Sequence, residues 1–260
     1  PDLDISTVSG NEDTAIALDL EGSVSGGGEI VSYEIASIPT GAVLSVGGVA
    51  LVAESDGSYL LTPAQAETVM ITPPSNSGVD IPLTITINSQ EADVDGGDPV
   101  TSSATENMTV VVDAVADAPN LSVEAASGNE DTAIALSIDT SLNDLDGSEV
   151  LTGVTISGVP AGATLSAGTL QSDGSYLLTP AQLEGLTITP SEDSNADFSL
   201  TVTSTISETD PETGVVSSNE TSTTLPVTVA AVAETPDLDI STVSGNEDTA
   251  IALDLEGSVS

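Results

Sequence analysis

Carboxylates are the reactive groups that this sequence offers in number. The chain has 260 residues, with 42 Asp and Glu, no Lys, Arg, His or Cys, and a formal net charge of −42. The acids gather in three patterns: GNED, which opens the phrase GNEDTAIAL at 10–18, 128–136 and 245–253; DAVADAP at 113–119; and NDLDGSE at 143–149. Groups of carboxylates at such spacing can hold a cation or work as an acid–base pair.

Clustered carboxylates here need a cation from outside, because the chain has no positive side chain to pair with them. Two carboxylates about 5 Å apart repel by about 1 kcal/mol in water and by about 3 kcal/mol at an effective dielectric of about 20. Ca²⁺ relieves this repulsion with six to eight oxygen ligands, whereas Mg²⁺ needs a stricter octahedron and keeps its waters. We therefore expect Ca²⁺ as the cofactor. The alternative for each segment is a solvated turn stabilised by its own Asn and Asp side chains.

Other function classes fit the composition poorly. A glycosidase-like pair needs one acid in an apolar cleft with a raised pKa, but these acids lie among Gly and other acids. We therefore expect no enzyme. Nucleic acid is excluded as a partner, because its phosphates need cationic side chains. No run approaches the roughly 20 apolar residues that span a bilayer, so we expect no membrane insertion.

The acids are carried by an internal repeat. Pro1, Pro119 and Pro236 begin equivalent units, and residues 236–260 copy residues 1–25 letter for letter. We predict one domain at 1–118, a second at 119–235, and at 236–260 the first strands of an incomplete third that does not fold alone. Each full repeat is long enough to bury a core of its own.

Short alternating runs of Val, Ile, Leu and Thr fill both repeats, with Gly, Pro, Asn and Asp between them. This pattern predicts seven or eight strands per repeat and no substantial helix. The fold class is therefore all-β: tandem immunoglobulin-like antiparallel β-sandwich domains, end to end. In such a sandwich the GNED turn lies at the end that faces the next domain. We expect it to meet the linker 113–119 and the loop 143–149, with Asp210 of the acidic loop 208–214 as a further neighbour.

The segments DAVADAP and NDLDGSE resemble the calcium linker of cadherins and the Asp-x-Asp loop that meets it. Both repeats, through GNEDTAIAL, VTISGVPAGATLS, DGSYLLTPAQLEGLTITP and VADAP, resemble the tandem extender domains of giant bacterial adhesins of the RTX or LapA type. The resemblance implies a calcium-rigidified stalk on a bacterial cell surface that supports adhesion and biofilm formation. It implies these calcium ligands: Glu12 and Asp13 from the first domain, Asp113 and Asp117 from the linker, and Asp144, Asp146 and Glu149 from the loop.

The second linker departs from this pattern. It reads AAVAETP at 230–236, so Ala230 stands where the first linker has Asp113, and Glu234 replaces Asp117. The first repeat also has GGGE at 26–29 where the second has its Asp-x-Asp loop, and residues 236–260 copy the first repeat. The second junction therefore keeps chiefly Glu130, Asp131 and Glu234. We predict calcium joints that alternate between strong and weak.

The sequence favours an extracellular spacer whose partners are calcium ions and neighbouring repeats of the same chain. The absence of Cys fits either a reducing compartment or a bacterial exterior, and the high negative charge favours the exterior. Two alternatives remain open. One is a surface-layer or filament subunit that associates laterally through calcium. The other is a calcium-dependent module that binds a carbohydrate or protein, against which the chain has only three Tyr, one Phe and no Trp.

Overall fold

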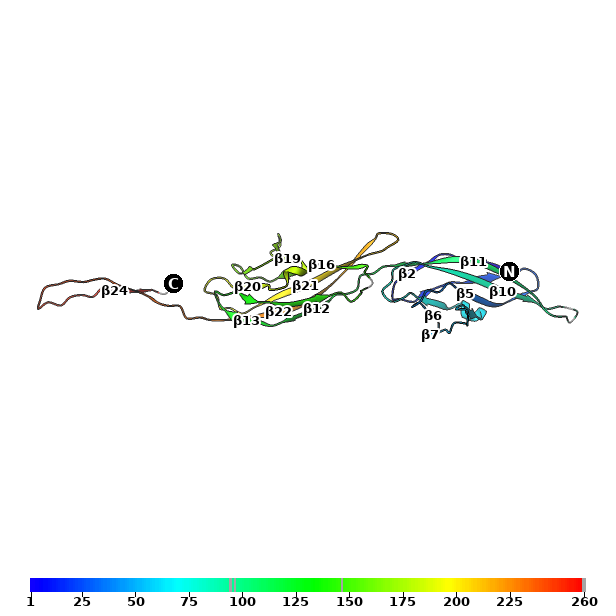
Figure 1. Cartoon of the computed structure of the whole chain (residues 1–260), viewed down its shortest axis with the longest axis horizontal. Helices are drawn as coiled ribbons and strands as arrows, with labels where there is room; N and C mark the ends of the chain where they lie inside the picture. The colour runs from blue at the N-terminus through cyan, green and yellow to red at the C-terminus, as the bar shows by residue number, and fades with distance from the viewer. Residues whose placement is uncertain (94, 96, 146, 259–260) are drawn as a thin grey trace. The chain divides into compact units, whose positions relative to one another are not determined.

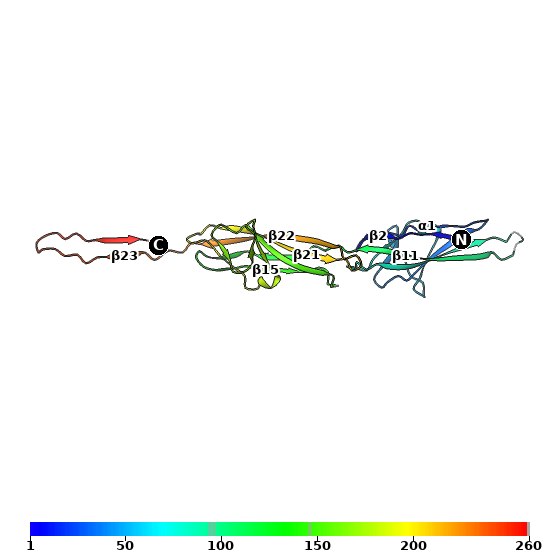
Figure 2. The same ribbon diagram turned by 90° about the horizontal axis from the view of Figure 1, so that it is seen from above.

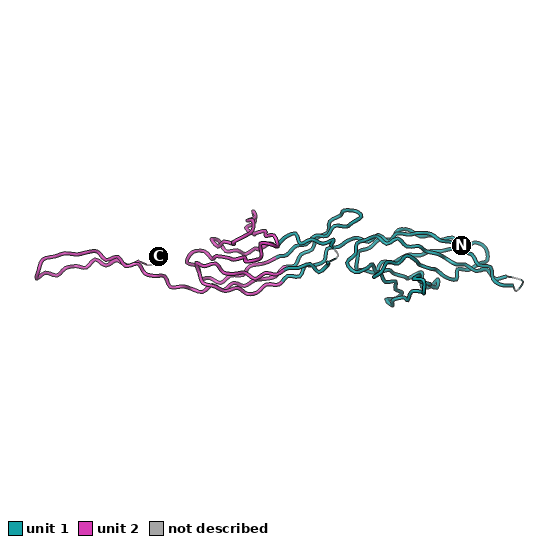
Figure 3. Tube along the Cα trace, viewed as in Figure 1, with its two compact units in different colours: residues 1–121, 140–153, 203–221 teal, residues 122–139, 154–202, 222–260 magenta. Residues whose placement is uncertain are grey.

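The computed structural model describes residues 1–93, 95, 97–145 and 147–258 (Figure 1). The chain divides into two compact units: residues 1–121, 140–153 and 203–221 form the first, and residues 122–139, 154–202 and 222–260 form the second (Figure 3). The repeat-based boundaries after residues 118 and 235 follow the sequence and stay a prediction. No helix within the described residues is long and apolar enough to cross a membrane.

The first unit contains a β-sandwich formed by the first repeat. Its strands are β1 (Asp2–Asp4), β2 (Val8–Asn11), β3 (Ile16–Ala17), β4 (Glu21–Ser23), β5 (Glu29–Ala36), β6 (Val43–Val46), β7 (Val49–Ala50), β8 (Tyr59–Leu61), β9 (Val69–Thr72), β10 (Ile81–Glu91) and β11 (Val100–Asp113), with one short helix, α1 (Pro63–Ala66). One sheet has the order β2-β11-β10-β5-β8, the other has the order β3-β9-β6-β7, and β1 pairs with β4. The long β10–β11 hairpin is antiparallel throughout (Figures 1 and 2).

The core of this sandwich is aliphatic. Alternate residues of β10, from Ile81 to Ile87, are at most 2% exposed. They pack in one cluster with Leu44 and Ile71 from the facing sheet, and Tyr33 is the buried aromatic ring within it. Burying one such aliphatic side chain stabilises a fold by about 1.5–3 kcal/mol. β-Branched side chains suit this half-buried, pleated surface, so the alternating runs form strands as predicted.

The first strand is divided between two partners. β1 pairs antiparallel with β4, whereas β2 pairs in parallel with β11, from Val8 opposite Val110 to Asn11 opposite Asp113. Two sheets, antiparallel except for the β2–β11 pair, pack over an aliphatic core, and this arrangement makes the domain an immunoglobulin-like sandwich. The parallel pairing has a functional consequence, because it brings the start of the linker at Asp113 beside the GNED turn.

The second repeat follows the same plan. Its strands are β12 (Asn120–Glu124), β13 (Ala126–Asn129), β14 (Ile134–Ala135), β15 (Ser137–Ser141), β16 (Glu149–Ser157), β17 (Thr164–Leu165), β18 (Thr169–Leu170), β19 (Tyr176–Leu178), β20 (Thr187–Thr189), β21 (Phe198–Thr209) and β22 (Val216–Ala230), with a 3₁₀ turn, η1 (Pro180–Gln182). The sheet orders are β13-β22-β21-β16-β19-β18 and β14-β20-β17, and β12 pairs with β15. β13 pairs in parallel with β22, as β2 does with β11.

Residues 236–258 form a hairpin of β23 (Asp237–Ile240) and β24 (Leu255–Ser258). Its apolar side chains are exposed to solvent: Leu238 is 62% exposed and Leu253 is 72% exposed. The matching residues of the first repeat, Leu3 and Leu18, are 7% and 0% exposed. The same sequence therefore contributes buried core residues in the first repeat and solvent-exposed residues in the hairpin at 236–258.

Candidate metal centre

The GNED phrase builds a turn at the end of β2. Gly10 must lack a side chain, because a Cβ there would lie 2.7 Å from Cγ1 of Ile16. Asp13 has a φ of 54°, in the left-handed region that Asp tolerates better than most residues. Thr14 closes the turn, since its hydroxyl donates a hydrogen bond to the carbonyl of Asn11 at 2.6 Å. The second copy at 128–132 repeats each of these features.

The glutamate of the phrase holds the linker. The backbone N–H of Glu12 donates to the carbonyl of Asp113 at 3.1 Å, and its Oε1 accepts the N–H of Val115 at 2.6 Å. Glu130 does the same in the second repeat, with Val232 as the donor to its carboxylate at 2.7 Å. The repeated phrase is thus a structural clamp, whether or not a cation is bound.

Side chains accept hydrogen bonds from four consecutive N–H groups of the first linker. Val115 donates to Glu12, Ala114 donates to Oδ2 of Asp210 at 3.3 Å, and Asp117 donates to Oε1 of Glu149 at 2.5 Å. The fourth acceptor is a hydroxyl, because Ala116 donates to Oγ of Ser217 at 2.8 Å. Asn219 adds a bond from its Nδ2 to the Ala116 carbonyl at 3.0 Å. The linker backbone is therefore fixed mainly by carboxylates.

Five acids around this linker are almost fully buried, and we call them the linker centre. All belong to the first unit, and their exposed fractions are 5% for Glu12, 3% for Asp144, 5% for Glu149, 1% for Glu208 and 5% for Asp210. The hydroxyl of Ser148 lies between two of them: it is 2.8 Å from Oε1 of Glu208 and 3.4 Å from Oδ2 of Asp144, and its single proton can be donated to either. Acidic side chains are rarely this buried unless they are paired or bind a metal.

Burial changes the protonation of two of these acids. It raises the pKa of Glu12 from 4.5 to about 7; the Val115 N–H opposes the rise, and the neighbouring Glu208 and Asp13 add to it. Burial likewise raises the pKa of Glu149, against the Asp117 N–H and together with the charges of Asp144, Asp117 and Glu208. Both acids therefore lie where an ionised carboxylate is costly.

Asp210 behaves differently from these two glutamates. Its pKa is lowered, first by the Thr213 hydroxyl and then by the N–H groups of Thr213, Ala114 and Glu212, while burial acts in the opposite direction. Asp210 thus stays ionised at neutral pH and adds a fixed negative charge to the linker centre. That charge increases the need for a cation nearby.

Two oxygens mark where a cation could bind. Among the described residues, Oε2 of Glu12 and Oε2 of Glu149 are buried and accept no hydrogen bond from the protein. Glu208 lies against Glu12, and two carboxylates can hydrogen-bond each other only if one is protonated. Since the chain has no cationic side chain, either a proton or an external cation must balance this group. A donor set of carboxylate oxygens suits Ca²⁺.

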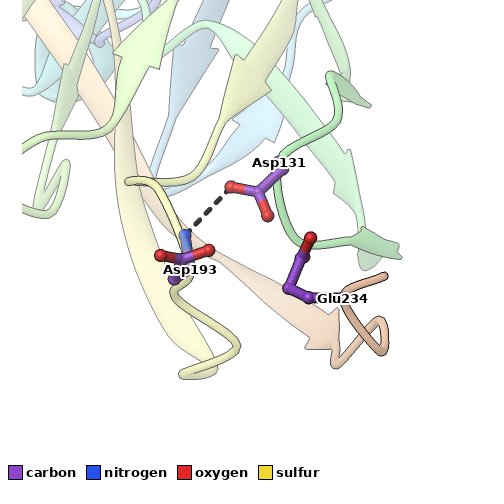
Figure 4. A group of neighbouring side chains, drawn as sticks. All are labelled: Asp131, Asp193 and Glu234. Carbon is purple, nitrogen blue, oxygen red and sulfur yellow. Dashed lines mark hydrogen bonds between the residues drawn. The ribbon is translucent and has the colours of Figure 1, made fainter. Parts of the chain in front are cut away.

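A second, smaller acidic group lies in the second unit. Carboxylate oxygens of Asp131, Asp193 and Glu234 all lie within 4.8 Å of one another, and all three side chains are exposed (Figure 4). The N–H of Asp193 donates to Oδ1 of Asp131 at 3.0 Å. In the first repeat Asn76 takes the place of Asp193 and donates in the same way to Asp13. Among the described residues this is the group whose three carboxylates lie close enough to share one ion. Its exposure to water makes a cation less necessary there than at the buried linker centre.

The structure brings together most of the predicted residues, but they differ in burial and in the hydrogen bonds that they make. Glu12, Asp144 and Glu149 lie in the linker centre, and Asp117 is half-buried beside Glu149. Asp13 and Asp113 are exposed: the carboxylate of Asp13 accepts the N–H of Asn76, and Asp113 contributes its carbonyl to Glu12. Asp146 lies outside the described residues. In the second repeat Glu130 is 6% exposed and clamps its linker, while Asp131 and Glu234 join Asp193.

Sequence reasoning missed Glu208 and Asp193. The burial of Glu208 was predictable, because Glu208 lies two residues after Ile206 in the alternating pattern of β21. Both side chains are at most 1% exposed. Strand periodicity therefore predicts an inward-facing acid at position 208. Asp193 had no such signal, since it lies in a loop where neither spacing nor alternation indicates its partner.

No protein-family model matches the chain, and a comparison with curated protein sequences finds no match. Among solved structures it is similar to titin domains Z1Z2 in complex with telethonin, with 10% identity, a TM-score of 0.29, and coverage of 88% of this chain and 94% of that one. Drosophila N-cadherin EC1-4 is similar with 15% identity, a TM-score of 0.26, and coverage of 97% of this chain and 57% of that one. The D00-D0 domain of intimin is similar with 13% identity, a TM-score of 0.27, and coverage of 86% of this chain and 98% of that one. Similarities this distant carry no argument about function, and the fold assignment rests on the strand order and core described above.

Proposed function

We propose that this chain is a section of an extracellular spacer in which Ca²⁺ bound at the linker centre fixes the segment between successive β-sandwiches. One observation carries the proposal: five acids that are at least 95% buried surround the linker, and two of their oxygens have no protein donor. A chain without a single Lys, Arg or His can balance this charge only from the medium.

Ca²⁺ would stabilise the linker by mass action, because it binds the folded arrangement and not the separated carboxylates of the unfolded chain. The residues that would contribute oxygens are Glu12, Glu149 and Glu208, with Asp144 and Asp210 nearby. No three of these carboxylates lie within 4.8 Å of one another in the described structure, so a bound ion would have to draw them closer. Extracellular calcium modules commonly bind at about 10⁻⁴ to 10⁻³ M, a range that suits a spacer outside the cell. The bacterial surface and the role in adhesion are supported by the sequence resemblance alone.

Calorimetric titration of Ca²⁺ into the metal-free chain tests this proposal. We expect saturable binding that Glu149→Gln and Glu208→Gln weaken by at least tenfold, because each removes a buried charged oxygen while keeping the side-chain shape. Glu106→Gln is the matched control, since Glu106 is an exposed acid on β11. Equal weakening by all three substitutions would indicate diffuse attraction to a charged surface and would overturn the proposal.

Small-angle scattering of the full chain tests the mechanical part. If Ca²⁺ fixes the linker, chelation should broaden the distribution of maximum dimensions, and restored Ca²⁺ should narrow it again. Scattering curves that do not change on chelation would contradict the spacer mechanism even if Ca²⁺ binds. Sedimentation at several protein concentrations addresses the alternative of a surface-layer or filament subunit, because lateral assembly would make the sedimentation coefficient rise with concentration.

A further inference from the structure

A cavity opens on the second sandwich, between the loop of residues 190–197 and the turn of residues 158–163. Its volume is about 220 Å³. The lining is mainly apolar and comes from Pro160, Ala163, Pro190, Ala196 and Phe198, with Asp197 as the charged residue beside them. All of these residues lie in the second unit, whereas the linker centre belongs to the first. We call this feature the loop cavity.

The aromatic wall of the loop cavity has no counterpart in the first sandwich. Phe198 is the single phenylalanine of the chain, and it is half-buried. Its counterpart is Ile81, because each follows an acid, Asp197 or Asp80, whose carboxylate accepts a backbone N–H of β22 or β11. Ile81 is only 2% exposed. The first sandwich therefore buries an aliphatic side chain where the second presents part of an aromatic ring.

Two smaller side chains widen the loop cavity. The segments PSEDSNAD at 190–197 and PPSNSGVD at 73–80 correspond residue by residue, so Ser191 stands in the place of Pro74 and Ala196 in the place of Val79. Ser191 lies against Gly162 as Pro74 lies against Gly41. Both replacements remove apolar carbon atoms from the wall. The second repeat thus leaves room where the first has its own side chains.

The rim of the loop cavity is acidic. Glu192, Asp193 and Asp197 are exposed, and the chain has no positive side chain to offset them, so the local field attracts cations and repels anions. Oδ1 of Asp197 accepts the N–H of Val229 at 2.8 Å, which fixes this carboxylate at the rim. A carboxylate can accept further hydrogen bonds, so Asp197 can also pair with an ammonium or guanidinium group.

We propose that the loop cavity is a docking site for a partner protein, and that it takes one apolar side chain that is followed by Lys or Arg. Its volume lies below the roughly 300–1,000 Å³ of small-molecule sites, so it fits one side chain better than a whole ligand. Burial against the prolines and Phe198 supplies affinity, and the basic neighbour meets Asp197. A buried anchor surrounded by a polar rim is how protein interfaces concentrate their binding energy.

Short peptides test the proposal by nuclear magnetic resonance of the full chain in about 0.15 M NaCl, which screens diffuse attraction. The probe is acetyl-Gly-Leu-Lys-Lys-amide. One matched peptide, acetyl-Gly-Gly-Lys-Lys-amide, keeps the charge without the apolar side chain, and another, acetyl-Gly-Leu-Glu-Glu-amide, reverses the charge. Shifts of the backbone amides of Ala163 and of residues 191–198 report binding. All samples contain the same Ca²⁺ concentration, so that the linker centre stays in one state.

We expect the probe to bind at least tenfold more tightly than either matched peptide. Ala196→Leu should weaken this binding at least tenfold, because it fills the loop cavity from an exposed position that the core does not need. Val79→Leu is the matched control in the first sandwich, where Val79 is 54% exposed, and it should leave binding unchanged. Asp197→Asn should weaken binding at least threefold, although the amide oxygen can still accept the Val229 N–H.

Other occupants of the loop cavity give different results, and each would overturn the proposal. Equal binding of the two lysine peptides would indicate diffuse attraction to a chain of net charge −42. Equal binding of the glutamate peptide, or of neutral cyclohexanol at the same amides, would indicate an unselective apolar cavity. A dimer in sedimentation that Ala196→Leu abolishes would assign the cavity to a second copy of this chain. No shift with any peptide would show that the cavity is a packing defect.

Discussion

Glu12 combines two roles that conflict in the absence of a cation. Its Oε1 fixes the linker through Val115, which requires burial, and burial makes its own charge costly. Its Oε2 has no donor from the protein among the described residues. A proton or a cation can resolve this conflict, and the two differ in how stability depends on pH.

We predict that the metal-free chain loses stability as pH rises from about 5 to about 8. The folded-state pKa of Glu12, about 7, lies above the ordinary value of 4.5, so the folded state binds the proton more tightly than the unfolded state. The stabilising contribution is therefore complete below about pH 4.5 and is lost as pH rises through about 7. Glu149 acts in the same direction, because its pKa is also raised. Urea midpoints in chelator at several pH values measure this loss.

Glu12→Gln supplies the control for this pH dependence. An amide oxygen can still accept the Val115 N–H but cannot titrate, so the variant should show a shallower decline between pH 5 and 8. Saturating Ca²⁺ should also flatten the decline, since a bound cation keeps the carboxylates ionised. Repulsion among ordinary surface acids changes mostly between pH 3 and 5, where their pKa values lie. A midpoint that rises from pH 5 to 8 in chelator would contradict the account of Glu12.

At the scale of elements, the GNED turn is a local structure that forms with or without a sandwich around it. The close approach of glycine to isoleucine occurs in all three copies, with 2.7 Å at Gly10, 2.6 Å at Gly128 and 2.6 Å at Gly245. Only the first two copies are part of a packed core. The contribution of the turn to stability should therefore depend on the copy.

Gly10→Ala should destabilise the first sandwich by about 1–3 kcal/mol, the usual cost of forcing an extra methyl group into a packed site. The new methyl would meet Ile16, which is 5% exposed and pairs with β9. Gly245→Ala introduces the same clash against Ile251 in the exposed hairpin. It should leave the main unfolding transition unchanged, and equal destabilisation of that transition by both substitutions would show that the packing around Ile16 does not set the cost of the clash. Urea unfolding followed by circular dichroism compares the two variants.

Strand periodicity explains how much of these elements could be predicted from the sequence. Alternation located the inward-facing side chains of β10 and the immunoglobulin-like class, because burial on one face imposes a period of two. The same alternation includes Glu208, which lies within β21, although its acidic neighbours group it with the loop at 208–214. The strand beginning at Val216 is longer than its apolar run suggests, since the polar residues before Leu225 pair through their backbone.

The candidate site was predictable to a different degree. The meeting of the GNED turn, the linker and the loop at 143–149 follows from the course of a sandwich, and the structure brings these segments together. Which acids of these segments are buried and which are exposed could not be predicted from residue types. Asp13 and Glu12 are adjacent acids, but the left-handed backbone at Asp13 leaves its side chain exposed while Glu12 is buried. Their metal-binding roles stay a prediction.

For the whole molecule, the question is whether calcium acts at a built site or only screens a chain of net charge −42. Self-repulsion destabilises any compact state of such a chain, and every salt relieves part of it. Screening depends on ion charge and concentration and hardly on ion size. A site of converging carboxylates also depends on ion size and coordination number.

Mg²⁺ distinguishes these two effects, because it has the charge of Ca²⁺ but demands an octahedron and keeps several waters. At equal millimolar concentration in 0.15 M NaCl, we expect Ca²⁺ to raise the melting temperature of the metal-free chain by several degrees more than Mg²⁺ does. A free Ca²⁺ concentration of about 100 times the dissociation constant would add about 2.7 kcal/mol to the free energy of unfolding. Glu208→Gln should abolish the difference between the ions, while the exposed control Glu106→Gln should retain it. Equal melting temperatures in the two ions for the unmodified chain would show that screening alone accounts for the effect of calcium.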